Sequence, residues 1–173
     1  MRGHVILSHG SDSGPEATKV SALARVAESL GWTTSRPDYR EEDQLGYAGS
    51  VPPRVARLVE AMQGQPRPLV LAGSSMGAFV SGLASLRAPC QGLFLVALPI
   101  GIPGCPQRFD AAPGVPGMLV HGYRDELCPV EAAVAFVRGR GMPALLLDDD
   151  HRLGNHVAAL ERQFELFLRA VAD

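Results

Sequence analysis

The chain has 173 residues, of which 46% are hydrophobic and 20% charged, and its formal net charge is −2. These values are typical of a globular protein, and the length predicts a single domain over residues 1–173. The chain has no basic run and no apolar run of bilayer length, which argues against a nucleic-acid surface and against membrane insertion. Three cysteines without paired spacing and a polar N-terminus without a secretory signal favour a cytoplasmic location.

The N-terminal half alternates strand-like and helix-like runs. The apolar run HVILSH predicts a buried strand, and Ser13 or Gly14 is expected to cap the helix that follows. The expected elements, in chain order, are a strand over residues 4–9, a helix over 15–30, a strand nearer an edge over 32–39, a polar loop over 41–51 and a helix over 53–63.

The same alternation continues through the C-terminal half. The expected elements are strands over 67–73, 92–98, 117–122 and 143–148, helices over 75–87, 130–139 and 154–171, and a loop rich in proline and glycine over 99–116. Continuously apolar strands alternating with helices predict an α/β fold, in which a mostly parallel sheet of about six strands is covered by helices on both faces. Functional residues are then expected on the loops that follow the strands.

The segment Gly73–Gly77 fits the pattern G-x-S-x-G between a predicted strand and a predicted helix. At such a turn Ser75 is held in a strained conformation that exposes its hydroxyl, and flanking side chains would collide with neighbouring backbone. The alternatives are a packing turn of small residues and a phosphate-binding loop, and the latter lacks the glycine–lysine pair that it requires. We therefore interpret Ser75 as a nucleophile.

A serine nucleophile needs a base that removes its proton. His151, between the last strand and the last helix, is the best candidate, and His156 on the following helix is its competitor. The acidic run of residues 148–150 could form a metal loop, but no second histidine lies four residues from His151, so neither a metal nor a cofactor is expected.

The base in turn needs an acid that fixes its tautomer. Asp125 follows the strand over residues 117–122 by a tight turn and is the preferred candidate. Glu126 and Asp148 are alternatives, and aspartate is also common in turns for local reasons.

An oxyanion hole would complete the site. The backbone amide of Met76, directly after the nucleophile, is one expected donor, and the amide of Ser11 in the loop after the first strand is the second. His9 and Gly10 shape that loop, and a structural role for His9 is preferred over a catalytic one.

These motifs resemble those of the α/β-hydrolase superfamily, in particular its small, lidless members of the dienelactone-hydrolase and carboxylesterase type. The resemblance rests on His9-Gly10 after the first strand, the turn Gly73–Gly77, the segment His121–Asp125 and the segment Asp149–His151. It covers nearly the whole chain and implies strand order 2-1-3-4-5-6, without the first two strands of the larger fold. Dienelactone hydrolases carry a cysteine where this chain has Ser75.

The expected activity is hydrolysis of a small-molecule carboxylic ester or thioester through an acyl-enzyme at Ser75. The loop over residues 99–116 is expected to form one wall of an open site, with Ile100, Ile102 and Phe109 as apolar candidates; Ile100, Ile102, His9 and Gly10 are the predicted substrate contacts. An amidase or peptidase with the same residues, and a silent scaffold of the same fold, are the alternatives. The sequence leaves open whether the protein is a monomer or a homodimer.

Overall fold

The fold is built on one sheet of six parallel strands in the order β2-β1-β3-β4-β5-β6. The structure is a computed structural model that describes residues 1–173. The strands are β1 (His4–Ser8), β2 (Thr33–Ser35), β3 (Leu69–Ser74), β4 (Gly92–Val96), β5 (Gly117–Gly122) and β6 (Ala144–Leu147). Both the parallel sheet and its strand order confirm the prediction from the sequence.

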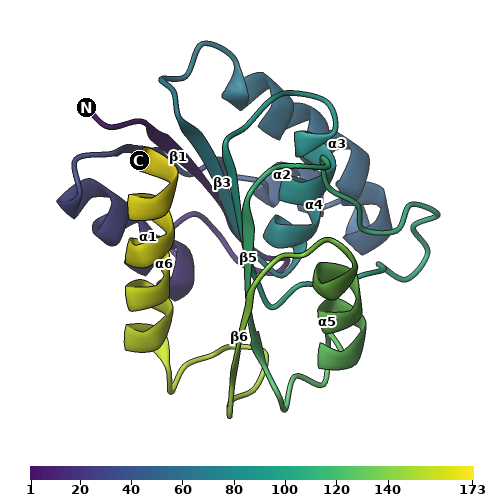
Figure 1. Ribbon diagram of the computed structural model, residues 1–173. Coiled ribbons are helices and arrows are strands. Elements are labelled where there is room, and N and C mark those ends of the chain that lie inside the picture. The colour runs from purple at the N-terminus through teal and green to yellow at the C-terminus, as the bar shows by residue number, and fades with distance from the viewer.

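Helices cover both faces of this sheet, which gives three layers (Figure 1). The helices are α1 (Thr18–Ser29), α2 (Arg40–Asp43), α3 (Gly46–Met62), α4 (Met76–Ser85), α5 (Val130–Gly139) and α6 (Val157–Ala172). In Figure 1, α1 and α6 lie together on one side of the sheet, and α3, α4 and α5 lie on the other. None of the helices combines the length and apolarity that a membrane span requires.

The four central strands are mostly apolar because both of their faces are buried. Every residue of β1, β3, β4 and β5 is buried, whereas the edge strands β2 and β6 are mostly half-buried. The register places Ser8 beside Gly73 and Ser74 beside Val96, so the carboxyl ends of the central strands lie next to one another. The loops that follow these strands therefore meet at one edge of the sheet.

The prediction of a loop over residues 41–51 is wrong. These residues form α2 and the first part of α3, which passes through Pro52 and Pro53. Proline is unfavourable inside a helix, and for that reason the sequence suggests a later start. Here Ser50, Val51 and Arg54 are buried on one face of α3, and this tertiary packing outweighs the local propensity.

Two other boundaries also differ from the sequence prediction. The helix expected over 15–30 begins at Thr18, and its N-cap is Ala17 without a side-chain hydrogen bond, instead of Ser13 or Gly14. The strand expected over 32–39 contains only Thr33–Ser35. The chain then turns, and Tyr39 is buried against His9 in the loop between β1 and α1 (residues 9–17), which is called the first loop below.

The packing of α6 against the sheet gives a direct test of this architecture. Phe164 is fully buried, with its ring 4.7 Å from that of Phe94 on β4. We expect Phe164→Ala to lower the free energy of unfolding by about 3–5 kcal/mol, because it leaves a cavity in the core. Leu166→Ala, at a position that is 52% exposed on the same helix, should change it by less than about 0.5 kcal/mol. Urea unfolding measures both values, and equal effects would contradict this packing.

Candidate active site

Ser75 lies in the sharp turn between β3 and α4, with φ 56° and ψ −120°. A non-glycine residue in this region is strained, and the surrounding backbone has to hold it there. The Ser75 amide donates to the carbonyl of Val96 at 2.9 Å. A Cβ at Gly73 would lie 2.2 Å from the Gly77 oxygen, and one at Gly77 would lie 1.9 Å from the Ser8 oxygen. Both flanking positions therefore require glycine, as the sequence predicted.

Three of the predicted site residues come together in one chain of hydrogen bonds. The Ser75 Oγ lies 3.1 Å from His151 Nε2, and the His151 Nδ1 lies 2.7 Å from Asp125 Oδ2. Ser75 follows β3, Asp125 follows β5 and His151 follows β6, so three parallel strands supply one side chain each. With a proton on Nδ1, the imidazole presents its free Nε2 to the serine hydroxyl.

Asp125 is held by its own turn. Its Oδ1 accepts the amides of Leu127 at 2.9 Å and Cys128 at 2.7 Å, which leaves Oδ2 for His151. Burial alone would raise the pKa of Asp125, but the hydrogen bonds from His151 and from the Cys128 amide outweigh it and keep the pKa below its usual value. Asp125 is thus poised as an anion beside the imidazole.

The competing residues have other partners. His156 donates to Asp149 through Nδ1 at 2.9 Å, and this pair closes the loop that carries His151. Asp148 forms an exposed ion pair with Arg124 at 2.9 Å. Glu126 is exposed, and the hydrogen bond of His151 Nδ1 goes to Asp125 instead. The geometry therefore favours His151 over His156, and Asp125 over both acidic alternatives.

The loop that carries His151 is also fixed by Lys19, a residue that the sequence did not indicate. Lys19 Nζ donates to the carbonyls of His151 at 3.4 Å and Arg152 at 3.0 Å. Burial lowers the pKa of Lys19. Its position on α1, more than a hundred residues away in the chain, gives no local signal of this contact.

The two amides predicted as oxyanion donors are those of Ser11 and Met76. Neither donates a hydrogen bond to another protein group. The Met76 amide stands at the N-terminus of α4, where the helix dipole favours negative charge. Gly10 lies against Ser75, since a Cβ added to Gly10 would be 3.5 Å from the Cβ of Ser75. The first loop and the turn of α4 thus flank Ser75 from two sides.

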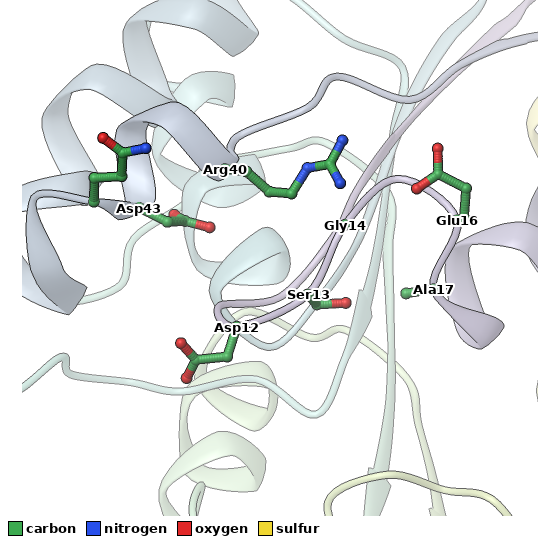
Figure 2. Close-up of a pocket in the computed structure, with 8 residues that line it drawn as sticks. Asp12, Ser13, Gly14, Glu16, Ala17, Arg40 and Asp43 are labelled. Carbon is green, nitrogen blue, oxygen red and sulfur yellow. The ribbon is translucent and has the colours of Figure 1, made fainter.

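Two hollows lie beside these residues. One, of about 710 Å³, is lined by Asp125 and His151 together with Tyr123, Leu127 and Arg152, among others. The other, of about 620 Å³, lies next to the first loop, and Figure 2 shows Arg40 and Asp43 of α2 on one side of it and Asp12, Ser13 and Gly14 on the other. Asp125 and His151 line the first hollow, although Ser75 does not, and none of the three lines the second, so the first is the better candidate for a substrate site.

A family model described as an alpha/beta hydrolase domain matches residues 1–159. The chain belongs to the α/β-hydrolase family. A protein from Xanthomonas campestris pv. campestris, described as a hydrolase of the alpha/beta superfamily, is 44% identical over 98% of each chain, with a TM-score of 0.91. A comparison with curated proteins gives no match.

More distant structures share the fold. An α/β serine hydrolase without a lid from Xanthomonas campestris is 22% identical, with a TM-score of 0.70 over 96% of this chain and 81% of that one. Est1E from Butyrivibrio proteoclasticus is 20% identical, with a TM-score of 0.76 over 97% of this chain and 87% of that one. At this identity the likeness concerns the fold of the hydrolase alone.

The apolar residues predicted to contact substrate are less accessible than the sequence suggested. Ile102 is buried and Ile100 is half-buried, and both pack against the core on the α4 side of the sheet. Phe109 is also in this core, with its ring 4.7 Å from that of Phe136. His9 is fully buried: Nδ1 donates to the Gly10 carbonyl at 2.7 Å, and Nε2 accepts the Tyr39 amide at 3.0 Å. These contacts agree with a structural role for His9.

His121 and Cys128 are buried next to Asp125, and sequence reasoning gave neither of them a role. The His121 Nδ1 accepts the Leu98 amide at 3.2 Å, and its Nε2 donates to the Cys128 carbonyl at 2.7 Å. Burial, with a further contribution from Asp125, raises the pKa of Cys128 to about 12. Asp125, Cys128 and His151 could together offer three metal ligands within 4.8 Å. A protonated thiol and two side chains already paired with each other make a poor metal site.

The three buried histidines predict how stability responds to acid. Burial lowers the pKa of His4, of His9, which lies beside Arg54 and Asp43, and of His121, which lies beside Asp125 and His151. As the pH is lowered, these histidines are protonated in the unfolded chain before they are protonated in the folded protein. The free energy of unfolding should therefore fall as the pH drops below the unfolded pKa of about 6.5. Urea unfolding between about pH 8 and pH 5 measures this slope. An unchanged free energy of unfolding across that range would contradict the prediction.

Proposed function

We propose that this α/β hydrolase is a serine hydrolase that cleaves carboxylic esters or thioesters of small or flexible acyl groups. The observation that supports this most directly is the unbroken chain of hydrogen bonds from Ser75 through His151 to Asp125, at 3.1 Å and 2.7 Å. The same chain of partners is the working arrangement of serine nucleophiles on several folds.

In the proposed reaction, the Ser75 oxygen attacks the substrate carbonyl and its proton passes to His151 Nε2. Asp125 accepts the hydrogen bond from Nδ1 and stabilises the imidazolium that forms. When the bond to the alcohol or thiol breaks, His151 returns the proton to that leaving group. Water then attacks the acyl-enzyme with His151 as base, which releases the acid and restores Ser75.

The negative charge of each tetrahedral intermediate would be bound by the Ser11 and Met76 amides. Both amides lack a protein acceptor; Met76 directly follows Ser75, and Ser11 follows Gly10, which lies against Ser75. Donors that are fixed before the reaction cost no reorganisation at the moment when charge develops, and one such donor is worth about 10²- to 10³-fold in turnover.

The substrate class follows from the shape of the site. The hollow next to His151 is open to solvent. No helix or strand that could act as a lid is inserted between β4 and β5. Exposed Tyr123 and Leu127 offer apolar contact, while Arg152 offers a cation at the rim. We propose a small-molecule substrate without a cofactor, and the cleavage of an amide is the second possibility.

Hydrolysis of p-nitrophenyl acetate, butyrate and octanoate tests the proposal. We expect turnover in the wild type and a loss of about 10⁴- to 10⁶-fold in Ser75→Ala, because the acyl-enzyme can no longer form. Ser29→Ala, at an exposed position near the end of α1, should keep wild-type turnover. The dependence on chain length would report the size of the acyl site.

Labelling by a fluorophosphonate probe separates an enzyme from a silent scaffold of the same fold. Labelling of the wild type but not of Ser75→Ala is the expected result. A folded wild-type protein that neither turns over the esters nor takes up the probe would overturn the proposed activity.

Replacement of the acid tests the role of the imidazole tautomer. In Asp125→Asn, the amide oxygen would still accept the Leu127 and Cys128 amides, which turns the NH₂ group toward His151 Nδ1. The imidazole would then carry its proton on Nε2 and could not act as a base, so turnover should fall about 10⁴-fold. Asp148→Asn is the matched control, and its turnover should stay within about twofold of the wild type. Equal losses in the two variants would contradict the assignment of Asp125.

A further inference from the structure

Arg54 on α3 is the largest fully buried side chain in the protein. A buried charge without partners costs several kcal/mol, so the contacts of this guanidinium explain why it is there. It forms a two-pronged ion pair with Asp43, from Nε to Oδ1 at 2.6 Å and from Nη2 to Oδ2 at 2.6 Å. Its carbon centre lies 4.5 Å from the centre of the Tyr39 ring.

The remaining hydrogen bonds of Arg54 go to the first loop and not to its own element. Nη1 donates to the His9 carbonyl at 2.7 Å, and Nη2 donates to the Gly10 carbonyl at 3.1 Å. The Gly10 carbonyl also accepts from His9 Nδ1 at 2.7 Å. Two consecutive carbonyls of this loop are thus held by one planar group.

Holding the Gly10 carbonyl also sets the direction of the next amide. The Gly10 carbonyl and the Ser11 N–H belong to one trans peptide unit, in which the two groups point in opposite directions. Since the carbonyl points at Arg54, the Ser11 N–H points away from α3. Gly10 itself lies against Ser74 and Ser75. The guanidinium therefore fixes which way the first loop presents its free amide beside the nucleophile.

We propose that Arg54 is a positioning residue for the oxyanion hole, and that it acts through the peptide unit between Gly10 and Ser11. This inference rests on the proposed function. Because Asp43 neutralises Arg54, the contribution is one of geometry and not of net positive charge. A lysine at position 54 would keep the charge but has no planar fork with which to hold Asp43 and two carbonyls together.

The test uses the full chain with three variants. The double variant Arg54→Met with Asp43→Asn removes the guanidinium without leaving a half-buried carboxylate unpaired, and Arg54→Lys keeps the charge. Arg57→Met is the control, since Arg57 lies one turn further along α3 and contacts Asp38 and Glu42 without touching the first loop. Circular dichroism and thermal unfolding establish that each variant is folded at the assay temperature.

The expected result is a fall in kcat of about 10- to 100-fold in both Arg54 variants with little change in KM, since the amide is displaced and not deleted. A substrate-like trifluoromethyl ketone, which forms a tetrahedral adduct with the serine, should lose affinity in the same proportion as kcat/KM. The corresponding methyl ketone, bound without that charge, should keep its affinity. A purely structural role would not separate these two ligands.

Two results would overturn the proposal. They are a wild-type kcat in either folded Arg54 variant and equal losses of affinity for the two ketones. If the double variant does not fold, Arg54→Lys decides the question alone. Failure of the proposed function would show differently, as a wild-type protein with no turnover and no labelling at Ser75.

Discussion

The site depends on one close approach of backbone to backbone. The first turn of α4 packs so tightly onto the end of β1 that a single methyl group at Gly77 would lie 1.9 Å from the Ser8 carbonyl. This contact allows the chain to reverse at Ser75 with a positive φ and exposes the serine oxygen at the edge of the sheet. It also brings the loop after β1 against the same serine, so that one packing contact places Ser75, the Met76 amide and that loop next to one another.

Long-range polar contacts then hold the loops that such a turn brings together. The first loop is tied by Arg54 from α3, and the loop of His151 is tied by Asp149 and by Lys19 from α1. Loops generally have few apolar contacts of their own, and their backbone groups need partners. Here helices from both faces of the sheet supply those partners, which keeps the edge of the sheet rigid where the proposed chemistry takes place.

The loop over residues 99–116 belongs to the core and contributes little to the hollow beside His151. This loop turns apolar side chains inward, and Ile102, Phe109 and Ala111 complete the core on the α4 side of the sheet. The apolar residues of that loop are therefore used for stability. In the proposed function, selection among substrates would fall to Tyr123, Leu127 and Arg152, which line the hollow together with Asp125 and His151.

The sequence by itself determined the α/β class, the strand order through the family resemblance, and the position of Ser75, because apolar strands and a glycine-flanked serine are local patterns. It also singled out Asp125 and His151, since residues after parallel strands must meet at one edge. Only the tertiary structure decided the helix over Gly46–Val51, the burial of Ile102, and the contacts of Arg54 and Lys19. These depend on partners distant in the chain, and a helix carrying a buried arginine has the same local sequence pattern as one carrying an exposed arginine.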